Sequence, residues 1–280
     1  MTVLHTYLTP KERVYQENVL AVFSELKYRY LGNFLYQRNA REREDGVKNS
    51  PIIEGEVEAY LRDAGYTEMQ IGSAIAQLKE KAYLPHANMG SLLQVNNDFY
   101  NVLVDGVKCK PAADKNEENV YFINFKDYGL NRFAIAEEVS YYDGLTGEGS
   151  RPDLVVYVNG IAVAVIELKR STVSLDEGIK QMLSNEADLI PSFFTTAQYT
   201  IAASSGNGFS YGTIDTPKKF WCPFKSDGQK VGDVLTDKES FRLFFAPKTF
   251  IDLLRYGVVN DGGVKKVMRP HQYYALVHAK

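Results

Sequence analysis

The chain has 280 residues, 45% of them hydrophobic and 24% charged, so it is long enough to bury a sizeable core as one large domain or two unequal ones. A net charge of −3 gives no general attraction for nucleic acid, so any such binding would have to come from local basic patches. Two distant cysteines do not favour a disulfide framework or structural zinc, and neither a membrane-spanning run nor a signal peptide is seen, so we expect a cytoplasmic protein. The candidate basic patches, which are also consistent with an ordinary solvated surface, are Lys218/Lys219/Lys225 and Lys265/Lys266/Arg269.

The N-terminal third has helical periodicity. Apolar residues recur at three- and four-residue steps from Val14 to Tyr30, and Gly32 is placed to end that helix. After a polar stretch over 36–50, two further helices are expected over roughly 52–64 and 67–82, the second with Thr67 as its N-cap. These three helices are expected to form a cap on one side of a sheet.

From Phe99 the pattern changes to strands. Asp105-Gly106 is a strong hairpin signal, and a second Asn-Gly turn at 159–160 joins two apolar runs. The remaining expected elements are strands over 119–125, 132–142 and 198–205, helices over 174–190 and 247–256, and a mostly irregular segment over 206–240. The sum predicts an α/β fold bordering on α+β, with a mixed central sheet flanked by helices.

Residues 151–170, R-P-D-L-V-V-Y-V-N-G-I-A-V-A-V-I-E-L-K-R, place charges at the ends of two otherwise buried strands. Asp153, Glu167 and Lys169 are costly there unless they are paired or bind a metal. Glu167 and Lys169 share one face of their strand because side chains alternate.

The register of this hairpin decides whether Asp153 joins them. A two-residue turn at Asn159-Gly160 would set Asp153 opposite Ile166, on the wrong face. A three-residue turn with Gly160 in the left-handed region, or a bulge near Pro152, would instead set Asp153 opposite Glu167.

Two carboxylates close together suit Mg²⁺ or Mn²⁺, and the backbone carbonyl of Leu168 is a natural extra ligand. Lys169 would orient or help deprotonate an attacking water and offset phosphate charge. Glu-x-Lys alone is weak, since Glu25-Leu26-Lys27 also matches. The alternative is a strand-end salt bridge from Asp153 or Glu167 to Lys169 or Arg170.

The same residues resemble the PD-(D/E)xK nuclease core of the motor (R) subunit of type I restriction enzymes, which is similar to the RecB-like nucleases. Residues 201–213 and 247–256 look like the family's segments after the nuclease core. R-P-H-Q-Y-Y-A-L at 269–276 resembles its adenine-sensing Gln motif. The resemblance covers roughly 100–280.

The resemblance implies a catalytic centre of Asp153, Glu167 and Lys169. It implies a metal shell of Asp153, Glu167, the Leu168 carbonyl and an acid on the first helix, for which Glu17 is chosen over its alternative as a solvated helix glutamate. The family's Gln-x-x-x-Tyr pair is here Gln181 and Asn185, a departure that keeps a polar pair on one helix stripe but loses the tyrosine. The residues expected to contact DNA are Gln181, Asn185, Lys180 and Arg170.

By resemblance, the chain divides into an N-terminal helical part (1–98), a nuclease core (99–260), and a linker with the start of a truncated helicase region (261–280). No G-x-x-x-x-G-K-[ST] motif is present, so Gln272 would contact nucleotide, and ATP would bind, only in a full-length protein. His271 and His278 are expected to be surface or packing residues.

The implied function is a Mg²⁺-dependent endonuclease of a type I restriction enzyme R subunit, with Mn²⁺ as a substitute. It would cut double-stranded DNA in a complex with methyltransferase (M) and specificity (S) subunits, without membrane association. Two alternatives stay open: a non-catalytic docking or DNA-binding module with a nuclease-like fold, and a stand-alone repair nuclease.

Overall fold

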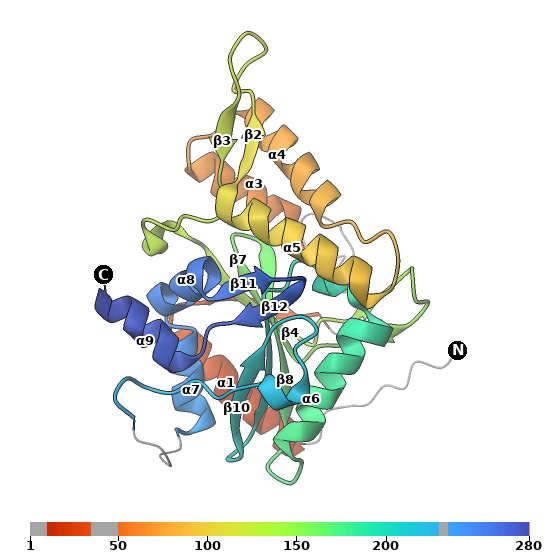
Figure 1. Cartoon of the computed structure of the whole chain (residues 1–280), viewed down its shortest axis with the longest axis vertical. Helices are drawn as coiled ribbons and strands as arrows, with labels where there is room; N and C mark the ends of the chain where they lie inside the picture. The colour runs from red at the N-terminus through yellow and green to blue at the C-terminus, as the bar shows by residue number, and fades with distance from the viewer. Residues whose placement is uncertain (1–9, 35–49, 230–234, 280) are drawn as a thin grey trace.

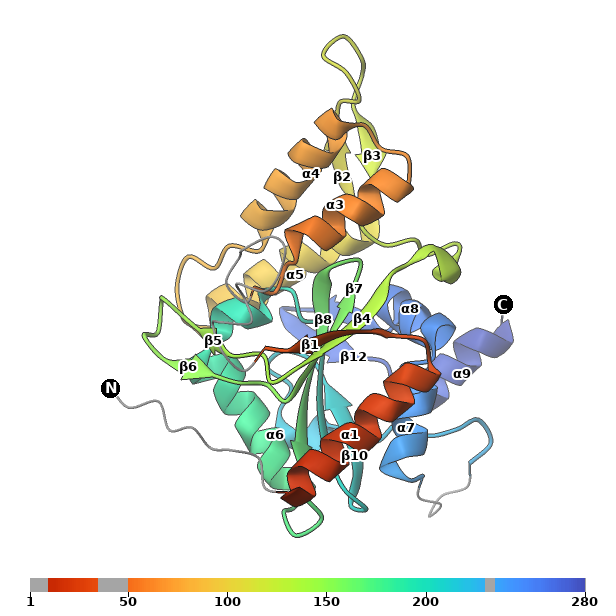
Figure 2. The same ribbon diagram turned by 180° about the vertical axis from the view of Figure 1, so that it is seen from behind.

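The computed structural model describes residues 10–34, 50–229 and 235–279 of the chain (Figures 1 and 2). Its α-helices are α1 (Pro10–Glu25), α3 (Glu54–Asp63), α4 (Glu68–Lys81), α5 (Met89–Asp105), α6 (Leu175–Ser184), α7 (Asp237–Phe244), α8 (Pro247–Tyr256) and α9 (Pro270–Ala279). Its strands are β1 (Arg29–Asn33), β2 (Val107–Cys109), β3 (Glu118–Val120), β4 (Phe133–Glu137), β5 (Tyr141–Tyr142), β6 (Gly149–Ser150), β7 (Leu154–Val158), β8 (Ile161–Lys169), β9 (Tyr199–Ser204), β10 (Gly208–Gly212), β11 (Val258–Asp261) and β12 (Val264–Val267).

A six-stranded mixed sheet in the order β1-β4-β7-β8-β9-β10 forms the centre of the molecule. The β1–β4 and β8–β9 pairs are parallel, and the other three pairs are antiparallel. The predicted fold class, a mixed sheet flanked by helices, is confirmed. The sheet also includes β1, which lies within the first 98 residues, so the helical N-terminal part contributes a strand to the core; the proposed domain boundaries stay a prediction.

Helices cover both faces of this sheet (Figure 2). Leu154 and Ile166 belong to a buried cluster that also contains the apolar side of α1 and aromatic residues of α7 and α8. Val155 and Val165, their immediate chain neighbours, belong to a second buried cluster that contains the apolar side of α6. Because alternate side chains point to opposite faces of a strand, α1 and α6 lie on opposite sides of the same strands.

Helices α3 to α5 and the β2–β3 hairpin form a part that projects beyond the β7–β8 turn (Figure 1). The Ile53 amide donates to the Gly160 carbonyl over 2.8 Å, and the Ala162 amide donates to the Pro51 carbonyl over 2.8 Å. The predicted three-helix cap is therefore only partly right: α1 covers a face of the sheet, whereas α3 begins at its hairpin end. None of the helices in the described ranges is long and apolar enough to cross a membrane.

Two glycine signals were interpreted wrongly. The first helix ends at Glu25, with Lys27 at φ 66°, and Gly32 lies inside β1 at φ 113°. Asp105-Gly106 ends helix α5, with Gly106 at φ 73°, and makes no hairpin. A positive φ is required both at a tight hairpin turn and after a helix C-terminus, so the dipeptide alone does not separate the two.

Other local signals are confirmed. Thr67 caps α4 in a capping box with Gln70, as its position before the apolar period predicted. Helix α6 passes into a single π-helical turn over Asn185–Leu189, and Pro191 follows, so the helix ends before the proline as predicted.

Candidate functional site

The β7–β8 hairpin has the one-residue offset that brings Asp153 opposite Glu167, although by a different device from either of those predicted. The turn is a two-residue one, with Val158 paired to Ile161 and with Asn159 and Gly160 at φ 51° and 84°. The register then shifts between Val156 and Tyr157, which leaves Val163 without a counterpart on β7. This bulge near the start of β8 takes the place of both predicted devices, the three-residue turn and the bulge near Pro152.

Beyond the bulge, three acids fall in one row across neighbouring strands. Glu137 pairs with Leu154, and Leu154 pairs with Ile166, so the next position along each strand is Glu138, Asp153 and Glu167. The Glu138 amide donates to the Asp153 carbonyl over 2.9 Å, which continues the β4–β7 pairing to this position. Glu138, Asp153 and Glu167 are called the carboxylate row below.

The side chains of Asp153, Glu167 and Lys169 make a close group on the α6 side of the sheet. Asp153 Oδ2 accepts a 2.7 Å hydrogen bond from the Leu168 amide. Lys169 Nζ lies 2.6 Å from Glu167 Oε1 and donates to Gln181 Oε1 over 2.5 Å. Glu167 is 1% exposed, and its Oε2 has no hydrogen-bond partner. The predicted metal role of the Leu168 carbonyl stays a prediction.

Burial shifts the pKa values of Asp153, Glu167 and Lys169. Burial, together with the charge of Glu167, raises the pKa of Asp153 well above its usual range. Burial also raises the pKa of Glu167, against the opposing effect of Lys169. Burial lowers the pKa of Lys169, but Glu167 and Asp153 outweigh this effect and the net pKa is raised, so Lys169 is a cation.

Helix α1 reaches the site through Gln16 and not through Glu17. Gln16 is buried, and its Nε2 donates to Glu137 Oε2 over 3.1 Å and to the Asp153 carbonyl over 3.3 Å. The side chain of Glu17 is 56% exposed and forms a 2.9 Å ion pair with Arg13. The structure therefore does not bring Glu17 into the predicted metal shell, because one residue along a helix rotates the side chain by about 100°.

The predicted DNA-facing pair on α6 is also divided. Gln181 is exposed and contacts Lys169, as described above. Asn185 is fully buried, and its Oδ1 accepts a 2.7 Å hydrogen bond from Ser150 Oγ on β6. Asn185 therefore does not present a DNA-binding surface and instead ties the π-helical turn to the segment just before Asp153.

The other two residues expected to contact DNA are Lys180 and Arg170. Lys180 is exposed and forms a 2.8 Å ion pair with Glu177. Arg170 follows Lys169 directly and is half-buried, with its Nε lacking a hydrogen-bond partner. Their role in DNA binding stays a prediction.

Comparison with known proteins identifies the family. The family model described as "Type I restriction enzyme R protein N terminus (HSDR_N)" matches residues 9–220, about three quarters of the chain. The chain belongs to this family.

Curated relatives agree with this HSDR_N membership. The type I restriction enzyme HindI endonuclease subunit of Haemophilus influenzae is 26% identical over 215 residues, which is 69% of this chain and 19% of the relative. The putative type I restriction enzyme MjaIXP endonuclease subunit of Methanocaldococcus jannaschii is 33% identical over 132 residues, 45% of this chain and 12% of the relative. The chain thus spans less than a fifth of the length of these relatives.

The HSDR_N site offers two carboxylates and no complete metal cage. Within the described residues, no three side chains of His, Cys, Asp or Glu are grouped so as to hold a metal ion. The donors nevertheless fit Mg²⁺, which prefers a few carboxylate oxygens and keeps several waters. The unpartnered Oε2 of Glu167 and the raised pKa of Asp153 are what a cation would relieve.

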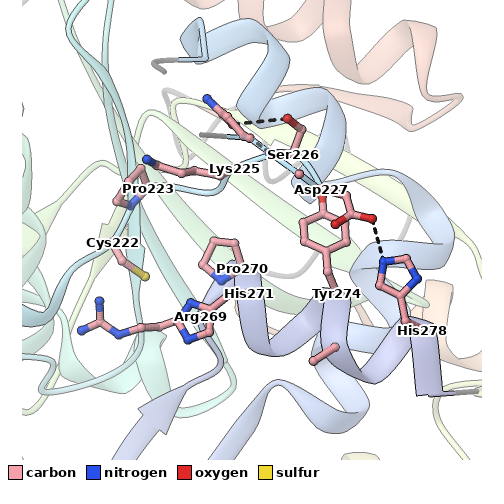
Figure 3. Close-up of a pocket in the computed structure, with 13 residues that line it drawn as sticks. Cys222, Pro223, Lys225, Ser226, Asp227, Arg269, Pro270, His271, Tyr274 and His278 are labelled. Carbon is pink, nitrogen blue, oxygen red and sulfur yellow. Dashed lines mark hydrogen bonds and ion pairs between the residues drawn. The ribbon is translucent and has the colours of Figure 1, made fainter. Parts of the chain in front are cut away.

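A separate cavity of about 490 Å³ lies between the 222–229 segment and α9, along the length of that helix (Figure 3). Arg269, His271 and His278 line it, and His278 Nε2 lies 2.7 Å from an Asp227 carboxylate oxygen. Gln272 is not among its lining residues: its Oε1 accepts from the Arg269 amide over 2.8 Å and caps the first turn of α9. A nucleotide role of Gln272 in a longer protein stays a prediction.

Sequence reasoning missed Gln16, Glu137, Glu138 and Arg151. The Glu-Glu pair at the end of the 133–137 strand was a visible signal, because it breaks an apolar run just as Asp153 does. What could not be seen was that β4 pairs with β7, which is what places Glu138 beside Asp153.

Proposed function

We propose that this chain is a Mg²⁺-dependent endonuclease domain that hydrolyses phosphodiester bonds of double-stranded DNA. The observation that carries the proposal is the register of the β7–β8 hairpin. Its bulge places Asp153 opposite Glu167 and leaves Lys169 on the same face, 2.6 Å from Glu167. A strand-end salt bridge alone would not explain why a second acid is buried beside the first one without its own cation.

The chemistry divides among these side chains. Asp153 and Glu167 would hold Mg²⁺, which when bound lowers the pKa of a water and stabilises negative charge on a phosphodiester. Lys169 is a cation with two fixed partners, Glu167 and Gln181, so it suits orienting a water and offsetting phosphate charge better than accepting a proton.

The names of the relatives, type I restriction enzyme endonuclease subunits, support a setting for this activity. We propose that the chain acts as part of an R subunit together with M and S subunits, which would supply target choice. ATP-driven movement along DNA would belong to parts of such a subunit beyond the segment matched here.

The first test is nicking of supercoiled plasmid by the purified chain with Mg²⁺ or Mn²⁺. Asp153→Asn and Lys169→Met should each reduce nicking at least about 100-fold, because the first removes a proposed metal ligand and the second removes the cation that offsets phosphate charge. Lys79→Met removes an exposed lysine of α4, paired with Glu54 and away from the proposed site, and should nick at close to the wild-type rate. Equal nicking by wild type and Asp153→Asn would contradict the proposal.

Calorimetric titration with Mn²⁺ covers the case in which the isolated chain needs its partners for cleavage. Wild type should bind Mn²⁺, and Glu167→Gln should abolish the binding. A folded wild type that binds no Mn²⁺ would favour the docking-module alternative. Nicking by the purified chain that added M and S subunits do not alter would instead favour a stand-alone nuclease.

A further inference from the structure

Glu138 is a buried acid that the proposed chemistry does not yet use. It is 2% exposed, and its Oε2 forms a 2.7 Å ion pair with Arg151 Nε. Its Oε1 is buried and accepts no hydrogen bond of ordinary length and angle, although Gln16 lies close enough to oppose the rise in the pKa of Glu138. A buried carboxylate oxygen without a donor is costly, so its retention calls for a ligand or a water that the chain does not itself provide.

Glu138 lies next to the two residues that are proposed to hold the metal. Glu138 stands in the carboxylate row beside Asp153, with a 2.9 Å backbone hydrogen bond between them. The charge of Asp153 acts on Glu138, and the charge of Glu138 acts in turn on Glu167, so the three carboxyl groups share one electrostatic environment. Glu138 also has φ 54°, a left-handed conformation that is unfavourable for glutamate by about 1–2 kcal/mol.

The neighbouring Glu137 shows what a purely structural acid looks like at this place. Its two oxygens accept hydrogen bonds from Arg13, Gln16, Tyr30 and Asn33, over 2.6–3.2 Å. Glu137 therefore anchors α1 and β1 to the end of β4, and its oxygens have little capacity left to accept further hydrogen bonds. Glu138 has one oxygen fixed and one oxygen open.

We propose that Glu138 is the third acid of the metal site and acts through water: its free Oε1 accepts a hydrogen bond from a water in the shell of the divalent ion held by Asp153 and Glu167. Arg151 fixes the other oxygen and so sets the direction of the carboxylate. This role agrees with the absence of a three-acid metal cage in the described residues, because Mg²⁺ keeps several of its waters and a carboxylate beyond them orients those waters.

The inference rests on the proposed function. Mn²⁺ titration calorimetry of the purified chain distinguishes a failure of the Glu138 role from a failure of the metal site. Glu138→Gln should weaken Mn²⁺ binding roughly tenfold, whereas Glu167→Gln should abolish it. Glu186→Gln is the matched control: Glu186 is another fully buried acid with unpartnered oxygens, on the π-helical turn after α6, and its loss should leave the Mn²⁺ affinity unchanged.

Glu138→Gln also removes the negative charge beside Arg151, so the positive charge of Arg151 would itself repel the ion. The double variant Glu138→Gln/Arg151→Met removes that charge and keeps the loss of the carboxylate. We expect its Mn²⁺ affinity to stay about tenfold below wild type, and it also serves if the single variant does not fold. Recovery of wild-type affinity in the double variant, or full affinity in a folded Glu138→Gln, would overturn the role of Glu138. If every variant, Glu167→Gln included, bound Mn²⁺ as wild type does, the metal site itself would be overturned.

Discussion

Asn159 and Gly160 form a turn that is buried, although most tight turns lie at the surface. The Asn159 Oδ1 accepts from the Arg132 amide over 2.6 Å, and its Nδ2 donates to the Phe122 carbonyl over 2.8 Å. A Cβ built on Gly160 would lie 2.7 Å from both the Ile53 carbonyl oxygen and Glu56 Cβ. Glycine is therefore required at position 160 for two reasons: its φ of 84°, and the close approach of the start of α3.

At this scale we predict that Gly160→Ala destabilises the protein by at least about 2 kcal/mol, since it adds a backbone clash to the strain of a positive φ. Gly206→Ala is the control, because Gly206 has φ 75° but no atom lies within 4 Å of the place that its added methyl carbon would take, and it should cost roughly 1 kcal/mol. Urea unfolding of both variants measures the difference, and equal losses would contradict the close-approach argument.

Helix α6 is the element that completes the site from outside the sheet. Its Gly178 lets the helix approach the strands so closely that a Cβ there would lie 3.3 Å from Lys169 Cγ and 3.3 Å from Ala202 Cβ. Gln181, one turn further, then contacts Lys169 Nζ. The position of Lys169 thus depends on how close this helix packs.

We therefore predict that Gly178→Ala lowers plasmid nicking about tenfold or more by displacing Lys169, while Mn²⁺ binding changes little. Gly72→Ala, at an exposed position of α4 with open space around it, should leave nicking unchanged and should stabilise the protein by up to about 1 kcal/mol through helix propensity. Nicking rates and thermal unfolding of the two variants provide the check. An unaffected rate in Gly178→Ala would show that Lys169 does not depend on α6.

On the scale of the whole molecule, Lys265 joins three distant parts of the chain. It lies on β12 and is only 4% exposed, and its Nζ donates to Asn96 Oδ1 of α5 and, over 2.7 Å, to Gln198 Oε1 just before β9. The basic patch expected at Lys265/Lys266/Arg269 is therefore not a continuous surface patch. Burial lowers the pKa of Lys265 to about 7.

This lysine predicts a pH dependence of stability. Its folded pKa lies below its unfolded value of 10.5, so between about pH 7 and 10.5 the unfolded state binds the extra proton and stability should rise with pH. Relative to Lys265→Met, wild type should gain stability as pH is raised from 7 to 9.5, measured by urea unfolding. Lys266→Met, which removes an exposed lysine paired with Asp261, should keep the wild-type slope. Parallel curves for wild type and Lys265→Met would rule out a neutral buried lysine.

Short stretches of sequence were enough to predict four features: the mixed helix-and-strand composition, the Thr67 cap, the end of α6 before Pro191, and the charged positions 153, 167 and 169 at strand ends. These follow from periodicity, backbone preference and the cost of burying charge, which are local properties.

Three features could be known from the folded chain alone: the bulge at Val163, the pairing of β4 with β7 that sets Glu138 beside Asp153, and the burial of the Asn185 side chain. Each of these depends on contacts between segments far apart in the chain. Their free energy comes from burying the whole core, so no short window of sequence contains it.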